Sequence, residues 1–272
     1  MGKKRLDILL VERDLVETSE KAKRLIMAGL VYSDEQRLDK PGMQVEEGIP
    51  LKVKGKKIPY VGRGGLKLEK ALKQFSISVK NKIMVDVGSS TGGFTDCALK
   101  NGLRLSYAID VGYNQLDWKL RSDERVVVME RTNFRYVTPE MLQSGKPELA
   151  TIDVSFISLK VILPVLKQLL ANNSDVIALI KPQFEAKREQ VGKKGIVRDK
   201  KVHFDVLKRL LTFALNEQYD LYNITYSPIT GGDGNIEFLV QLGWKKEKKG
   251  ILHTDVELEQ IVDDAHLAFL VN

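Results

Sequence analysis

The sequence predicts an α/β protein built around a seven-stranded sheet with an antiparallel last strand, preceded by a small α+β module. From residue 83 onward, short runs of β-branched and apolar residues alternate with segments of helical period. The first of these runs, 83–87, ends in a glycine-rich loop that opens a helix, as nucleotide-binding βα units do. The module before it, residues 1–60, has a different pattern and an excess of basic residues.

The loop after the first strand is the most informative stretch of the chain. The strand stops at Gly88 and small residues follow until Phe94, so bare backbone N–H groups can approach a ligand. The dinucleotide fingerprint needs Gly-x-Gly-x-x-Gly, whereas the spacing here is Gly88-x-x-x-Gly92-Gly93. A purely structural βα turn is the alternative interpretation. The candidate cofactor-binding residues of this stretch are Asp86, Gly88, Ser89, Ser90, Thr91, Gly92, Gly93 and Phe94.

The other elements alternate regularly along the chain. We expect helices at 66–75, from residue 94 to about 100, at 158–170 and at 201–216. Further strands are predicted at 105–109, 126–129, 149–152, 176–180, 221–226 and 236–242. Because only a short connection with a glycine turn at 231–234 joins the last two strands, the last strand is expected to be antiparallel.

Polar residues stand at the carboxyl ends of these strands, where ligands bind in open α/β sheets. Asp110 ends the second strand, 22 residues after Gly88, where nucleotide-binding folds place the carboxylate that takes ribose hydroxyls. Asp153 and Lys181 end the fourth and fifth strands, and Asn133 lies in the turn after the third. These side chains are therefore candidates for a site.

The composition excludes several classes of protein. A single cysteine, Cys97, excludes an internal disulfide framework and suits a reducing cytosol. The three histidines have no metal-ligand spacing, so we expect no metal site. No apolar run approaches the roughly 18 residues that a membrane helix needs, and the N-terminus lacks the apolar core of a signal peptide. We expect a cytoplasmic protein without a membrane partner.

The N-terminal module is basic. Residues 1–73 contain 17 lysines and arginines against 11 acidic residues, which is +6 of the net charge of +7. Such an excess suggests a nucleic-acid partner, and a solvated charged surface is the alternative. Two short helices, from Leu6 and over 20–28, precede strands near 30–32, 43–45 and 51–54. Glycines and lysines at 54–65 predict a linker, with a domain boundary near residue 60 and a second domain at 61–272.

This module resembles the S-four-type RNA-binding domain, also called the alpha-L motif. The matching stretches are 5–7, Ser19-x-x-Ala22, Ile26, 29–31 and a strand-turn pattern at 41–48. The family usually has a tight turn such as Asn-Gly after the first of its strands, but this chain has Ser-Asp-Glu at 33–35. The resemblance implies contacts with RNA phosphates rather than bases. The candidate RNA-binding residues are Arg5, Lys21, Lys23 and Arg24, with Arg63 in the predicted linker at 54–65.

Two further charged residues stand in unusual places. Glu237 lies between two apolar residues on the predicted last strand, and Lys67 lies on the helix before the first strand. With Asp153 and Lys181 they give the order Lys-Asp-Lys-Glu, which resembles the catalytic tetrad of the FtsJ/RrmJ-type ribose 2′-O-methyltransferases. For each residue alone, an ion-paired or surface charge is the alternative.

The order of motifs and of both domains resembles the TlyA family, many of whose members carry the label haemolysin A. The matching stretches are 61–68, 86–95, 110–118, 130–133, 153–158 and 181–185. That family joins an S-four-type domain to an FtsJ-like methyltransferase domain of Rossmann-like fold and methylates ribose 2′-hydroxyls of ribosomal RNA. The resemblance implies S-adenosylmethionine as cofactor and ribosomal RNA within ribosomal subunits as partner, with no protein partner evident.

The resemblance also implies a mechanism. The 88–93 loop and Asp86 would hold the methionine end of S-adenosylmethionine, Asp110 its ribose, and Thr132 and Asn133 its adenine. A flipped-out nucleotide would present its 2′-hydroxyl for in-line displacement. Lys181 would accept the hydroxyl proton if neutral, and otherwise would only orient the hydroxyl.

Three other functions are compatible with parts of the sequence. A cytolysin, as the family label suggests, needs an amphipathic or apolar membrane element, and only ordinary one-faced helices such as 256–270 are expected. An RNA-binding chaperone with an inactive methyltransferase fold is disfavoured by the intact tetrad and glycine loop. A methyltransferase of another RNA, such as tRNA, stays open because many RNA enzymes share the S-four-type domain.

Overall fold

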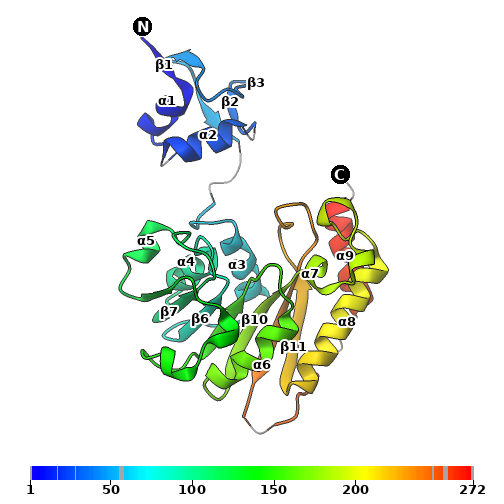
Figure 1. Cartoon of the computed structure of the whole chain (residues 1–272). Coiled ribbons are helices and arrows are strands. Elements are labelled where there is room, and N and C mark those ends of the chain that lie inside the picture. Colours follow the sequence, from blue (N-terminus) through cyan, green and yellow to red (C-terminus); the bar gives the residue numbers. More distant parts are fainter. Residues whose placement is uncertain are drawn as a thin grey trace. The chain divides into compact units, whose positions relative to one another are not determined.

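The computed structural model describes residues 2–16, 18–27, 29–54, 58–246, 248–253 and 257–270, except for the side chains of Arg24 and Leu270. The chain divides into two compact units, Met1–Lys57 and Ile58–Asn272 (Figure 1). Part of the predicted linker, residues 55–57, lies outside the described residues.

The first unit packs two helices against two small antiparallel sheets. Its helices are α1 (Leu6–Glu12) and α2 (Ser19–Met27). β1 (Lys3–Arg5) pairs with β4 (Gln44–Glu46), and β2 (Val31–Ser33) pairs with both β3 (Gln36–Arg37) and β5 (Lys52–Val53). Apolar side chains from both helices and the strands form a separate core, which includes Leu6, Leu10, Ile26, Val31 and Val45.

The two predicted helices and the three predicted strands of this unit are confirmed within a few residues. The sequence did not indicate β1 and β3, because they are two or three residues long and wholly polar. The unusual turn at 33–35 is a hairpin in which Ser33 pairs with Gln36. Asp34 takes a φ of +49°, a conformation that aspartate tolerates better than most residues.

The second unit is a seven-stranded sheet in the order β11-β12-β10-β9-β6-β7-β8. β12 is antiparallel to both of its neighbours, and the other neighbouring strands of this sheet pair in parallel, which confirms the predicted fold class. The strands are β6 (Ile83–Val87), β7 (Leu105–Ile109), β8 (Val126–Met129), β9 (Leu149–Ile152), β10 (Ser174–Ile180), β11 (Tyr219–Tyr226) and β12 (Phe238–Trp244).

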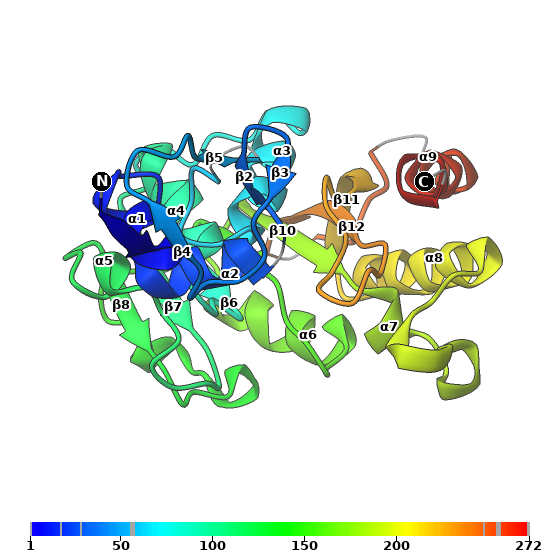
Figure 2. The same cartoon turned by 90° about the horizontal axis from the view of Figure 1, so that it is seen from above.

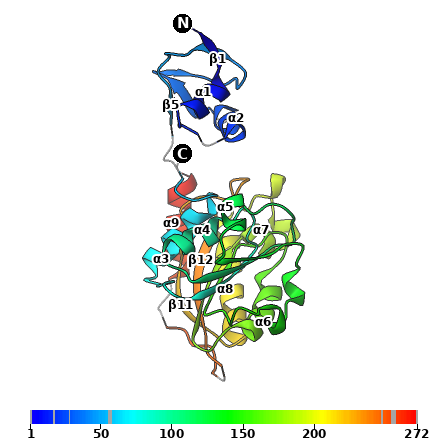
Figure 3. The same cartoon turned by 90° about the vertical axis from the view of Figure 1, so that its left-hand side faces the viewer.

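Helices cover both faces of this sheet (Figures 2 and 3). Side chains of α3, α4 and α5 share one apolar core with one face, and those of α6, α8 and α9 share the other core. Short 3-10 turns follow β8 and α7. The helices are α3 (Gly64–Gln74), α4 (Gly93–Lys100), α5 (Trp118–Arg121), α6 (Leu159–Leu169), α7 (Pro182–Glu185), α8 (Lys200–Asn216) and α9 (Leu258–Leu270).

The bounds of the four strands from β6 to β9 match the prediction residue for residue. The prediction is wrong for the last strand, which begins at Phe238 rather than at Ile236. Its pairing with β11 ends at Phe238 and Tyr226. Glu237 therefore precedes the strand, although its backbone carbonyl still accepts a hydrogen bond from the N–H of Ser227 (2.8 Å).

Candidate active site

The glycine loop between β6 and α4 needs glycine at two points. Gly88 and Gly92 have backbone φ values of +83° and +92°, which residues with a side chain rarely adopt. A Cβ atom on Gly88 would lie 2.5 Å from the backbone oxygen of Asp153, which ends the neighbouring strand. The loop can therefore lie against the end of β9 only with glycine at position 88.

Asp86 lies in β6, two residues before Gly88, and its side chain does not line the cavity described below. Its side chain is fully buried; one carboxylate oxygen accepts the hydroxyl of Thr95 (2.7 Å) and the other that of Thr151 (2.8 Å). Burial raises the pKa of Asp86 to about 6, although both hydroxyls favour the charged form. Since Thr95 is in the first turn of α4, Asp86 anchors the helix that follows the loop.

Asp110 ties the same loop to the end of β7. Its two carboxylate oxygens accept the N–H groups of Ser90 (2.8 Å) and Gly112 (2.7 Å). The N–H of Thr132 donates to the backbone carbonyl of Asp110 (2.9 Å), so the turn after β8 is adjacent. The side chain of Asn133 caps the next turn by accepting the N–H of Arg135 (3.1 Å). The structure thus brings together the predicted ribose and adenine residues.

A cavity of about 260 Å³ opens at the carboxyl ends of β6, β9 and β10. Its lining combines the glycine loop with all four residues of the predicted tetrad, which come from α3 and from the ends of three strands. The lining residues are Arg63, Gly64, Lys67, Gly88, Ser89, Ser90, Thr91, Gly93, Phe94, Asp153, Ser155, Lys181, Gly231, Gly232 and Glu237.

The tetrad forms a chain of alternating charges. Nζ of Lys67 lies 2.7 Å from Oε2 of Glu237 and 3.5 Å from Oδ2 of Asp153, and Nζ of Lys181 lies 2.5 Å from Oδ1 of Asp153. Lys67 and Glu237 are almost fully buried, while Asp153 and Lys181 are partly exposed in the cavity. Burial raises the pKa of Glu237, and the neighbouring Lys67 opposes that rise. The buried pair of Lys67 and Glu237 thus fixes Asp153, which in turn holds Lys181.

Glycines allow α3, which carries Lys67, to approach the loop. A Cβ atom on Gly93 would lie 2.8 Å from the backbone nitrogen of Gly65 at the start of α3. Asp96 of α4 accepts the N–H of Val61 (2.9 Å), so the segment before α3 is also bound to α4. The glycines of 61–65, which the sequence suggested as linker, belong to the second unit and begin α3.

Two aromatic residues and a serine were missed as site residues. Phe156 is 91% exposed and has a φ of +63°, and its ring lies 4.9 Å from that of Phe184. The hydroxyl of Ser155 lies 3.0 Å from Nζ of Lys181. An exposed aromatic ring with a strained backbone marks a surface on which a planar ligand can stack. The stretches 153–158 and 181–185 were noticed as motifs, but exposure cannot be derived from a motif.

The predicted RNA-binding residues differ in their surroundings. The guanidinium of Arg5 binds both carboxylate oxygens of Asp7 (3.0 and 2.7 Å), which leaves part of it exposed. Lys21 and Lys23 have exposed side chains on α2, and the side chain of Arg24 lies outside the described residues. Arg63 is exposed and lines the cavity.

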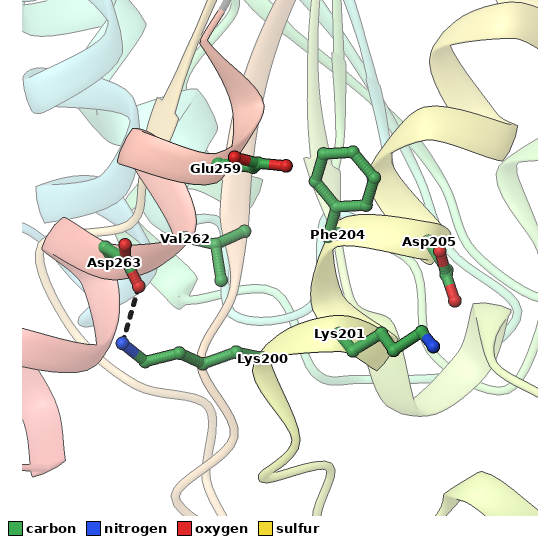
Figure 4. Close-up of a pocket in the computed structure, with 7 residues that line it drawn as sticks. All are labelled: Lys200, Lys201, Phe204, Asp205, Glu259, Val262 and Asp263. Atoms are coloured by element: carbon green, nitrogen blue, oxygen red, sulfur yellow. Dashed lines mark hydrogen bonds and ion pairs between the residues drawn. The ribbon is translucent and has the colours of Figure 1, made fainter.

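Another groove lies between α8 and α9 (Figure 4). Phe204 and Val262 line it together with charged side chains, and Lys200 and Asp263 pair across it (2.5 Å). None of the predicted site residues lines this groove. The described residues hold no cluster of potential metal ligands, and none of their helices is long and apolar enough to cross a membrane.

Comparisons with known proteins agree with this geometry. The FtsJ-like methyltransferase family matches residues 60–244, and the S4 domain matches residues 4–48. "Putative rRNA methyltransferase YqxC" of Bacillus subtilis is 66% identical over 97% of this chain and 94% of its own length. "16S/23S rRNA (cytidine-2'-O)-methyltransferase TlyA" of Mycobacterium tuberculosis is 39% identical over 88% of this chain and 89% of its own.

A solved structure agrees over both units. "Putative hemolysin from Streptococcus thermophilus" is 49% identical, covers 100% of this chain and 98% of its own, and has a TM-score of 0.81.

Proposed function

The chain belongs to the TlyA family of FtsJ-like methyltransferases, and we propose that it transfers a methyl group from S-adenosylmethionine to ribose 2′-hydroxyls of ribosomal RNA. The observation that carries this proposal is the cavity itself. There the Glu237–Lys67–Asp153–Lys181 chain of charges and the glycine loop face the same space, so a methyl donor and a hydroxyl acceptor can meet.

The loop side of the cavity fits S-adenosylmethionine. Gly88 and Gly93 line the cavity with bare backbone where the methionine part would lie, and Gly92 supplies the positive φ of the turn between them. Asp110 at the end of β7 would take the ribose hydroxyls. Thr132 and Asn133 would border the adenine. When bound, the sulfonium supplies the methyl group for in-line displacement. Asp86 would act from below, through Thr95, by fixing the loop and the first turn of α4.

The tetrad side of the cavity would hold the acceptor ribose. Lys181 lies at the cavity with Asp153 and Ser155 against its ammonium nitrogen, so it can contact a hydroxyl placed between them. In its neutral form Lys181 would accept the proton that the 2′-hydroxyl loses. Lys67 and Glu237 would keep Asp153 in place. When a bound substrate excludes water from the cavity, the attraction between these charges becomes stronger.

The first unit supports RNA as the substrate class. It matches the S4 domain, and exposed lysines of α2 can bind phosphates without reading sequence. Phe156 can stack on a base that has been flipped out of a helix so that its ribose reaches Lys181. Ribosomal subunits are cytoplasmic particles, so we infer that the enzyme works in the cytoplasm.

Methyl transfer to isolated subunits tests the proposal. Purified protein and radiolabelled S-adenosylmethionine are incubated with small and large ribosomal subunits from a strain that lacks the enzyme. We expect label in the ribosomal RNA of at least one subunit. Label in tRNA instead would show that the enzyme methylates RNA but that tRNA is its substrate. Absence of label from all RNA would overturn the proposal. Leakage of liposomes by the pure protein at low concentration would instead favour a cytolysin.

A further inference from the structure

Two segments carry the acceptor side of the cavity. The loop between β9 and α6 carries Asp153 and Phe156, and the segment that begins α7 carries Lys181 and Phe184. Besides the contacts within the cavity and the paired rings of Phe156 and Phe184, the side chain of Glu185 joins the two segments. Glu185 at the end of α7 accepts the N–H of Leu159 with Oε1 (2.7 Å) and the hydroxyl of Ser158 with Oε2 (2.6 Å).

The start of α6 is a favourable place for this carboxylate. The first N–H groups of a helix have no partner within the helix, and its N-terminus carries partial positive charge. Ser158 is the N-cap of α6, and its oxygen accepts the N–H of Lys160 (3.1 Å). Its hydroxyl hydrogen is therefore available to Glu185, and the two short bonds to a charged acceptor are of the stronger kind.

The backbone of Glu185 is bound by a third helix. Arg209 of α8 donates to the carbonyl oxygen of Glu185 (3.1 Å). Glu185 thus connects α6, α7 and α8 at one point, four residues after Lys181. A shift of α7 relative to α6 would have to break these bonds and would move Lys181 relative to Asp153.

We propose that Glu185 is a positioning residue for methyl transfer: it clamps the Lys181 segment to the Asp153 loop at the separation in which an acceptor nucleotide fits. The inference rests on the function proposed above for this cavity. Glu185 does not line the cavity and acts through Lys181, Asp153 and the paired rings of Phe156 and Phe184. A misplacement of about 1 Å at reacting groups can cost on the order of 100-fold in rate.

Two variants at this position test the clamp. In Glu185→Ala we expect kcat for methyl transfer to fall by about tenfold or more while the Kd of S-adenosylmethionine stays within about twofold. In Glu185→Gln we expect most of kcat to return. The amide oxygen can still accept the N–H of Leu159, and the amide nitrogen can donate to the oxygen of Ser158.

A matched control separates positioning from stability. Glu217→Ala removes the ion pair between Glu217, at the end of α8, and Lys167 of α6 (2.7 Å). Lys167 is in the last turn of α6, at the end opposite to the Glu185 contact. We expect this variant to keep the wild-type kcat. The positioning role is overturned if Glu185→Ala keeps the wild-type kcat, or if Glu217→Ala loses kcat to the same extent at an equal loss of thermal stability.

Hydrogen exchange distinguishes failure of the clamp from failure of the proposed function. The amide of Leu159 should exchange faster in Glu185→Ala than in the wild type or in Glu217→Ala, whatever the substrate of the enzyme. Unchanged exchange would show that the clamp does not hold α6. If Leu159 exchanges faster in Glu185→Ala but the wild type methylates no RNA, the contact of Glu185 with α6 is confirmed and the proposed function is wrong.

Discussion

Nζ of Lys181 lies 2.5 Å from Oδ1 of Asp153, at the carboxyl ends of two adjacent parallel strands. The second oxygen of the same carboxylate faces Lys67, whose ammonium is also paired with Glu237. One carboxylate thus lies between two lysines, and the side chain of Lys181 is the more exposed of the two, at 11% against 6% for Lys67. From this asymmetry we infer that Lys181 contacts the acceptor and that Lys67 supports Asp153.

The role of Lys181 as proton acceptor predicts the effect of arginine at this position. We expect Lys181→Arg to lower kcat by about 10²–10⁴-fold, because a guanidinium stays protonated and general-base catalysis contributes on that order. Single-turnover methyl transfer measures the loss, and calorimetric titration with S-adenosylmethionine verifies that the cofactor still binds. Lys187→Arg on the exposed surface is the control. A Lys181→Arg enzyme within about tenfold of the wild type would mean that Lys181 only orients the hydroxyl.

The glycine loop predicts a strict requirement at position 88. Gly88→Ala combines a positive φ with a Cβ atom 2.5 Å from the oxygen of Asp153, so the loop must move. Gly234 has a similar φ of +93° but open space around a Cβ atom, and Gly234→Ala isolates the backbone strain of about 1–3 kcal/mol. We expect Gly88→Ala to lose cofactor binding and Gly234→Ala to keep it. Equal affinities for the cofactor would contradict this role of Gly88.

The raised pKa of Asp86 predicts that the stability of the protein depends on pH. Its pKa is raised from 3.8 to about 6 in the folded protein, so between these values the folded state binds more protons than the unfolded state. The contribution of Asp86 to the unfolding free energy therefore falls as pH rises through this window, by about 3 kcal/mol at most.

Urea unfolding at pH 4 and pH 7 measures this dependence. The loss of unfolding free energy between the two pH values should be smaller in Asp86→Asn than in the wild type. The raised pKa of Glu237 acts in the same direction in both proteins, so it cancels in the comparison. An equal loss in both proteins would show that Asp86 does not titrate in this window.

The exposed ring of Phe156 predicts a defect confined to the RNA substrate. Because the side chain is 91% exposed, Phe156→Ala should change thermal stability little. Loss of stacking on a base, worth about 1–3 kcal/mol, should lower kcat/KM for RNA by about 5- to 150-fold. Phe156→Tyr should retain most activity. If Phe156→Ala also weakened S-adenosylmethionine binding, the ring would belong to the cofactor side instead.

Much of the fold follows from the sequence because parallel strands buried on both faces need continuous apolar runs. The first four strands of the large sheet end where charged or small residues interrupt such runs, and their ends carry Asp110 and Asp153. The same rule failed for Glu237. Apolar neighbours on both sides suggested a strand interior, but the residue lies just before β12 and its carboxylate is paired with Lys67.

Other features depend on tertiary contacts that no local pattern contains. The sequence predicts that Asp86 helps to hold the cofactor because it is near the glycine loop, yet the hydroxyls of Thr95 and Thr151 bind both of its oxygens and its side chain does not line the cavity. The exposure of Phe156 and the bonds of Glu185 to the start of α6 arise from the meeting of two loops that are 26 or more residues apart. Periodicity predicts elements, and only packing decides which side chains of a loop reach the cavity.

The chemistry of the product tests the central claim most directly. Ribosomal RNA methylated in vitro by the wild type and by Lys181→Ala is digested to nucleosides, and these are analysed by mass spectrometry. We expect a nucleoside whose added methyl group is on the ribose for the wild type, and none for Lys181→Ala with cofactor affinity intact. A methyl group on the base, or equal ribose methylation by Lys181→Ala, would contradict the assignment of this cavity to ribose 2′-O-methylation.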